Sequence, residues 1–129
     1  MTSTLTGRAA TDRAARYAKQ LCSHLGRKLD TAFDADTGIG TIVRGGSVAT
    51  LTCTGTALEI AVTAPTQDDL LALMAVTQNH LERFGEKNEL VCVWDDATFL
   101  DEYEALRAEM NARRAADRAA RDAEQPTEG

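Results

Sequence analysis

The feature that most constrains the fold is an alternation of apolar and polar residues between positions 29 and 64. It is clearest over residues 58–64, where Leu, Ile, Val and Ala alternate with Glu, Ala and Thr before Pro65. A period of two is typical of a strand with one buried face, and proline ends such a strand because it has no N–H group to donate. Turns that contain glycine divide the region into segments. We expect an antiparallel meander with strands at 29–34, 39–44, 47–54 and 58–64.

Segments with helical periodicity flank this meander. The first predicted helix runs from Asp12 to Arg27, follows a short strand at residues 4–10, and places its apolar residues along one stripe. Thr11 supplies its expected N-cap. The second helix opens at Thr66, which forms an approximate capping box with Asp69, and ends near residue 85.

A last strand is expected at residues 89–95. This segment is apolar on both faces, which predicts an interior position in the sheet. The order β-α-β-β-β-β-α-β predicts an α+β fold, a two-layer sandwich with an antiparallel sheet and both helices on one face. It is an elaborated ferredoxin-like arrangement in which the two helices run antiparallel.

The C-terminal region predicts a long additional helix. Residues 96–124 contain no Gly or Pro and are rich in Ala, whereas residues 125–129 are expected to be disordered. We therefore divide the chain into an α+β domain, 1–95, and a helical extension. The apolar first half of this helix docks either on its own domain or on a second copy, which would give a homodimer. The alanine-rich second half either packs closely or projects into solvent.

Composition restricts the classes of partner. The chain of 129 residues has 14 basic and 20 acidic residues, a formal charge of −6, so its overall field does not favour nucleic acid or an anionic membrane surface. Charged residues interrupt any signal peptide, and no segment is long and apolar enough to span a bilayer. The three cysteines are widely spaced and are interpreted as reduced and partly buried. We expect a cytoplasmic protein.

Both histidines lie on the flank of a predicted helical stripe. Each can be a ligand or proton-transfer group at a cleft rim, or a boundary residue hydrogen-bonded within the fold, and the structural interpretation is favoured. Arg and Lys residues also make the first helix locally basic, which suits an acidic partner or a small carboxylate. The candidate ligand-binding residues are His24, Tyr17, Gln20, Lys28, His80 and Arg83.

The sequence predicts neither a metal site nor catalytic residues. Cys22 and His24 are two residues apart, so on a helix they point in different directions. His24 and His80 both lie in the C-terminal halves of helices that are expected to run antiparallel, which would place them near opposite ends of the helical layer. No motif indicates a cofactor, and a non-enzymatic role is favoured.

Several segments resemble one bacterial family. Residues 11–17, 19–25 and 80–84, with the closing strand that ends at Trp94, are similar to domain-of-unknown-function family 2218 over roughly residues 4–95. The family pattern often has a second histidine where this chain has Arg27. The resemblance implies an accessory role in iron or siderophore handling, because the domain also occurs fused to siderophore-interacting flavin reductases or near iron-uptake genes.

Three functions follow as hypotheses. The first is a small binding or accessory module with a small-molecule or iron-siderophore partner. The second is an oligomerisation or protein-interaction module that uses the C-terminal helix. The third is a metal- or cofactor-dependent enzyme.

Overall fold

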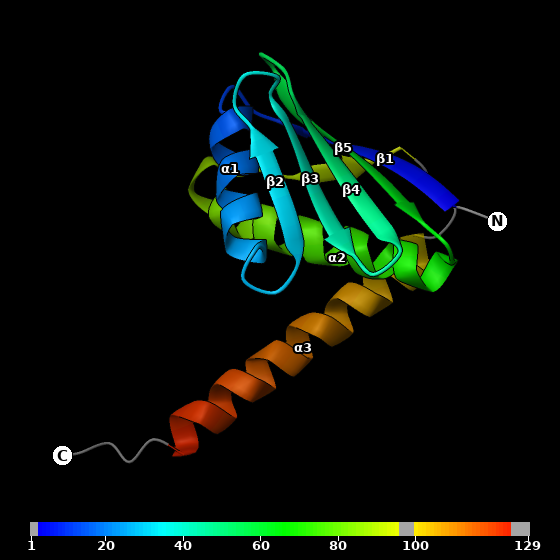
Figure 1. Ribbon diagram of the computed structural model, residues 1–129. Helices are drawn as coiled ribbons and strands as arrows, with labels where there is room; N and C mark the ends of the chain where they lie inside the picture. Colours follow the sequence, from blue (N-terminus) through cyan, green and yellow to red (C-terminus); the bar gives the residue numbers. More distant parts are fainter. Residues whose placement is uncertain (1–2, 96–99, 125–129) are drawn as a thin grey trace.

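The structure is a computed structural model that describes residues 3–95 and 100–124. It is an α+β fold with a layer of helices on one face of an antiparallel sheet, and α3 extends away from this body (Figure 1). The strands are β1 (Ser3–Ala10), β2 (Asp30–Asp34), β3 (Ile39–Arg44), β4 (Ser47–Cys53), β5 (Ala57–Ala64) and β6 (Cys92–Trp94). The helices are α1 (Ala14–Leu25), α2 (Gln67–Phe84), the short 3-10 helix η1 (Glu86–Asn88) and α3 (Leu100–Glu124). The predicted fold class is confirmed.

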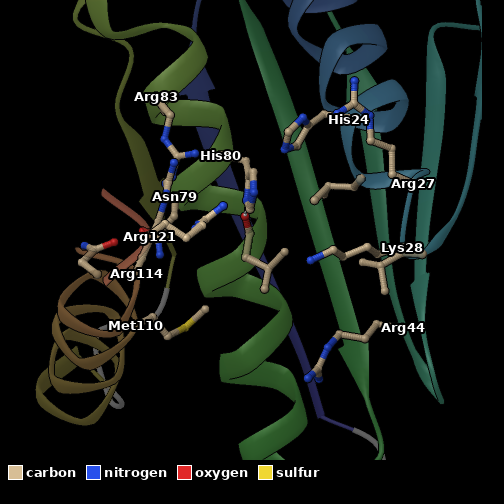
Figure 2. Close-up of a pocket in the computed structure, with 14 residues that line it drawn as sticks. His24, Arg27, Lys28, Arg44, Asn79, His80, Arg83, Met110, Arg114 and Arg121 are labelled. Atoms are coloured by element: carbon tan, nitrogen blue, oxygen red, sulfur yellow. Dashed lines mark hydrogen bonds between the residues drawn. The ribbon is translucent and has the colours of Figure 1, made fainter. Parts of the chain in front are cut away.

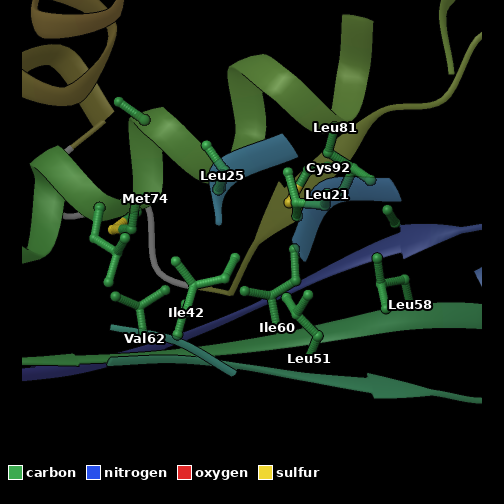
Figure 3. Close-up of a cluster of buried hydrophobic side chains, with 14 of the residues drawn as sticks. Leu21, Leu25, Ile42, Leu51, Leu58, Ile60, Val62, Met74, Leu81 and Cys92 are labelled. Carbon is green, nitrogen blue, oxygen red and sulfur yellow. The ribbon is translucent and has the colours of Figure 1, made fainter. Parts of the chain in front are cut away.

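The sheet has six strands in the order β2-β3-β4-β5-β1-β6. The meander β2 to β5 is continuous, and β1 pairs antiparallel with β5 so that Leu5 lies opposite Val62. Alternate residues of each strand point toward the helices and form the core (Figure 3). The alternation over residues 58–64 therefore has the predicted cause, since Leu58, Ile60 and Val62 are buried against the helical layer.

The two helices begin in different ways. At α2 the predicted cap is confirmed, because the Asp69 N–H donates to the Thr66 hydroxyl over 3.1 Å. The first helix begins later than predicted, at Ala14, with Arg13 at the N-cap position. The Thr11 hydroxyl instead accepts a hydrogen bond from the Arg13 N–H in the preceding turn. A short local bond of this kind competes with helical capping, which explains the difference.

The prediction of an interior last strand is wrong. The strand β6 lies at the edge of the sheet next to β1, and the Val91 and Val93 side chains are 57% and 64% exposed. Side chains of α2 hydrogen-bond to the backbone at its outer edge, because the Cys92 N–H donates to Glu82 and the Cys92 carbonyl accepts from Gln78. This edge therefore needs no neighbouring strand.

The strand β6 packs closely against β1 at a glycine. A Cβ atom at position 7 would come within 2.5 Å of the Trp94 ring. Since overlap of this size forces a shift of the neighbouring side chain, the absence of a side chain at Gly7 lets the indole pack directly against β1.

A buried polar network joins α2, β6 and α3. The Gln78 Oε1 atom accepts hydrogen bonds from the Trp94 indole and from the Tyr103 hydroxyl, at 2.7 and 2.6 Å. Its Nε2 atom donates to Glu82 and to the Cys92 carbonyl. Glu82 also pairs with Arg107 of α3 over 2.9 Å. The network fixes the first half of α3 to its own domain.

The two halves of α3 have different surroundings. Tyr103 is 4% exposed, and Leu106 and Met110 are half-buried against the core. Every described side chain from 111 to 122 is exposed. The predicted start of this helix at residues 96–99 and the predicted disorder of residues 125–129 lie outside the described residues. None of the described helices has the length and apolar composition needed to cross a bilayer.

Candidate functional site: a basic cavity beside two histidines

A cavity of about 660 Å³ lies where the C-terminal end of α1, the last half of α2, the end of β3 and the middle of α3 meet (Figure 2). Its apolar lining comes from Leu25, Leu29, Val76 and Met110. Its cationic lining comes from Arg27, Lys28, Arg44, Arg83, Arg114 and Arg121. The cavity therefore combines an apolar surface with six positive charges.

The charge of this cavity is opposite to that of the whole chain. The sequence carries 20 acidic residues and a net charge of −6. Yet the described residues that line the cavity include no Asp or Glu. The positive side chains come from β3, α2, α3 and the loop after α1, and all line one cavity. A concave, partly apolar surface strengthens the electric field of such charges. An anion is the complementary ligand for such a place.

Two histidines lie side by side in the cavity wall. The ring centroids of His24 and His80 are 5.1 Å apart, and the ring of Phe84 packs edge-on against His24 at 5.5 Å. Figure 2 shows the two imidazoles close together, with Lys28 and Arg44 extending toward the cavity on the side opposite α3. The prediction that the histidines lie near opposite ends of the helical layer is wrong.

The register between the two helices explains this difference. In Figure 1, α1 runs steeply down beside β2 at one edge of the sheet, whereas α2 runs across beneath the strands. Only residues 26–29 connect α1 to β2, so the end of α1 lies close to the edge of the sheet that β2 forms. Beyond α2, the Asn88 amide donates to the Tyr17 hydroxyl over 2.7 Å and holds the chain against α1. Tyr17 thus lies opposite Asn88 and His24 opposite His80, which is an antiparallel register. The chain beyond His80 extends toward the start of α1, so the two histidines lie at the same level along the helices.

Local hydrogen bonding determines which nitrogen of His80 is free. Its Nδ1 atom lies 2.7 Å from the Val76 carbonyl, one helical turn earlier. A carbonyl only accepts, so Nδ1 carries the proton and Nε2 of the neutral ring is left as an acceptor.

The surroundings of His80 favour its neutral form. Burial lowers the pKa of His80, the bond to Val76 partly opposes this, and the positive charges of His24, Arg114 and Lys28 lower it further. Both burial and nearby like charges disfavour an imidazolium. At neutral pH the His80 ring of the free protein is therefore largely uncharged.

The structure brings together four of the six predicted site residues. His24, Lys28, His80 and Arg83 line the cavity. Tyr17 is 4% exposed and bonded to Asn88, and Gln20 is exposed on α1 outside the cavity lining.

Four arginines of the cavity are absent from the predicted site residues. One of them, Arg27, belongs to the first helix that the sequence predicts to be basic, whereas the other three were not singled out. Arg44 ends a strand, and Arg114 and Arg121 lie on α3. No local signal marks them, because their part in the cavity depends on where β3 ends and how α3 crosses α2.

None of the three cysteines is among the described residues that line the cavity. All three are free; Cys22 and Cys92 are buried and Cys53 is half-buried. Burial, followed by the charge of Glu82, raises the pKa of the Cys92 thiol to about 12, so it is not a nucleophile at neutral pH. Within residues 3–95 and 100–124, no group of three or more His, Cys, Asp or Glu side chains has a metal-binding arrangement.

Comparison with known families identifies the domain. The sequence model of a family described as "Uncharacterized protein conserved in bacteria (DUF2218)" matches residues 6–95. The chain belongs to the DUF2218 family. The match spans β1 to β6 and includes both histidines, whereas α3 follows the matched DUF2218 region. Arg114 and Arg121 therefore reach the cavity from outside the family domain.

A solved structure has a similar fold. The chain is similar to the NMR structure of PA4090 from Pseudomonas aeruginosa, with 28% sequence identity and a TM-score of 0.61. The similarity covers 73% of this chain and 96% of that one. No curated protein matches this DUF2218 sequence.

Proposed function

We propose that this DUF2218 protein is a binding module for small organic anions that carry two or more negative charges. The observation that supports this most strongly is the cavity lining, which contains six cationic side chains and, among its described residues, no carboxylate. Arginine and lysine bind carboxylate and phosphate groups through charge-assisted hydrogen bonds, which are about twice as strong as neutral ones.

The other properties of the cavity favour an organic ligand over a bare inorganic ion. A volume of about 660 Å³ is within the range of sites for small molecules. Leu25, Leu29, Val76 and Met110 give it an apolar surface that a carbon skeleton can cover. The expected ligand therefore has an apolar body and negative groups directed toward the rim.

A ferric siderophore complex is a finer proposal within this class. Catecholate and carboxylate groups that chelate iron leave the complex with negative charge, which the cationic side chains of the cavity would bind. The accessory role in iron handling that the sequence resemblance implies motivates this choice. The ligand would then be the whole chelate, recognised by its charge and shape.

The test is isothermal titration calorimetry of the full chain with citrate. Because citrate carries three carboxylates, we expect a Kd in the micromolar range, weakening at 0.5 M NaCl as salt screens the charges. Triethyl citrate keeps the skeleton without the charges and serves as the matched control, for which we expect no measurable heat of binding. The ferric complex of 2,3-dihydroxybenzoate tests the siderophore proposal separately. Equal binding of citrate and its ester would contradict a charge-selective site.

A second candidate function is homo-oligomerisation through α3. The observation that favours it is the exposure of every described side chain from 111 to 122. Light scattering of the full chain and of a form ending at Met110 measures this, since the docked half of α3 stays in place. A dimer that becomes a monomer on truncation supports oligomerisation, whereas one monomeric mass for both forms excludes it.

A further inference from the structure

The histidine pair is the part of the cavity whose charge changes near neutral pH. The two imidazoles lie 5.1 Å apart, and His24 and His80 are both half-buried. The arginines of the cavity keep their charge at all physiological pH values. A change in the total charge of the cavity lining therefore depends on the histidine pair.

We propose that anion binding in this cavity is coupled to proton uptake by the His24–His80 pair, so that the loaded site holds the anion and an imidazolium together. The inference rests on the proposed function, because it concerns the regulation of the same site. The proton comes from the solvent and forms an N–H bond to a ring nitrogen.

Every charged group that faces the pair from the surrounding cavity lining is positive. Arg27 and Lys28 follow α1, Arg83 lies on α2, and Arg44 ends β3. The helix α3 adds two further positive side chains to this lining, Arg114 and Arg121. In the empty cavity an added proton therefore meets only repulsion from these lining groups. A multiply charged anion reverses the sign of this interaction and favours the imidazolium.

The hydrogen bond of His80 sets where the new proton binds. Nδ1 already donates to the Val76 carbonyl, so protonation occurs at Nε2. This converts an acceptor, which repels an anion, into a donor that can bind one. The neighbouring His24 ring lies close enough that a charge on either imidazole repels a charge on the other.

The sign of the pH dependence follows by linkage. Because burial and positive neighbours lower the pKa of His80 in the free protein and an anion favours its charged form, the loaded protein binds more protons than the free one. The affinity for a fully ionised anion therefore rises as the pH falls from the pKa of His80 in the loaded protein to its lower pKa in the free protein.

The test is an NMR titration of the imidazole C–H resonances of the full chain from pH 5 to 8.5, with and without saturating citrate. The chain has only two histidines, so His24→Gln and His80→Gln assign both curves. We expect citrate to raise the His80 titration midpoint by about one pH unit, equivalent to tenfold tighter binding to the protonated form.

The possible outcomes separate this inference from the proposed function. Citrate that perturbs the Lys28 and Arg44 resonances but leaves both histidine midpoints unchanged would overturn proton coupling and leave the anion site standing. Citrate that perturbs no resonance would overturn both. The wild-type titration does not depend on the folding of either variant.

Discussion

Exchanging Lys28 and Arg44 together for glutamate should weaken citrate binding roughly 30-fold, equivalent to about 2 kcal/mol. Both side chains are exposed and extend toward the cavity from the side opposite α3 (Figure 2). Each loses a charge-assisted contact of about 1 kcal/mol at a solvated rim and gains a repulsive carboxylate. Calorimetry at low ionic strength measures the change.

A matched control separates the effect of charge in the cavity on citrate affinity from the effect of the protein's net charge. The double variant Lys19→Glu/Lys87→Glu makes the same change in net charge at exposed positions outside the cavity lining. It should bind citrate within about threefold of the wild type. Since all four side chains are exposed, both variants should unfold at the wild-type temperature. Equal losses in the two variants would show that citrate responds only to the total charge of the protein.

Replacing Gln78 by leucine should lower the free energy of unfolding by about 3 kcal/mol. The change preserves volume but leaves the Trp94 indole, the Tyr103 hydroxyl and the Cys92 carbonyl without the partner that each now has. Each buried polar group left unpaired costs about 1–3 kcal/mol, partly recovered if β6 and α3 loosen enough to admit water. Denaturant unfolding measures the loss.

The fluorescence of the single tryptophan reports where the damage occurs. We expect a red shift of Trp94 emission as its indole gains contact with water. The neighbouring variant Thr77→Val is the control, because the Thr77 hydroxyl is buried and has no hydrogen-bond partner among the described residues. It should leave the stability unchanged or raise it. A Gln78→Leu variant within 1 kcal/mol of the wild type, with unshifted emission, would contradict the role of the network.

The antiparallel meander was predictable because apolar and polar residues alternate along its strands, and the apolar positions mark the buried face. The alternation at residues 58–64, the turns between strands and the capping threonine at position 66 are local signals of local structure. The strand β6 was misplaced because valine favours extended backbone whether or not it is buried. Its true position depends on Gln78 and Glu82, whose bonds to Cys92 no pattern in the sequence reveals.

The cavity was predictable only in part, because it depends on the register in which the helices pack. The sequence identified His24, Lys28, His80 and Arg83 as candidates from their place on helix flanks, and all four line the same cavity in the structure. It did not show that the histidines meet, because an order of elements does not fix the register between two packed helices. Nor could it assign the α3 arginines, since their approach depends on long-range packing.

The most direct test of the anion site is the citrate titration followed through the backbone amide resonances of uniformly labelled protein. Our account predicts saturable shifts confined to the region of the cavity lining: residues 24–29 at and beyond the end of α1, Arg44, residues 76–83 of α2 and residues 110–114 of α3. Triethyl citrate should shift none of them. Citrate shifts that are absent, or that fall on the uncovered face of the sheet and leave these residues unchanged, would contradict the assignment of this cavity as an anion site.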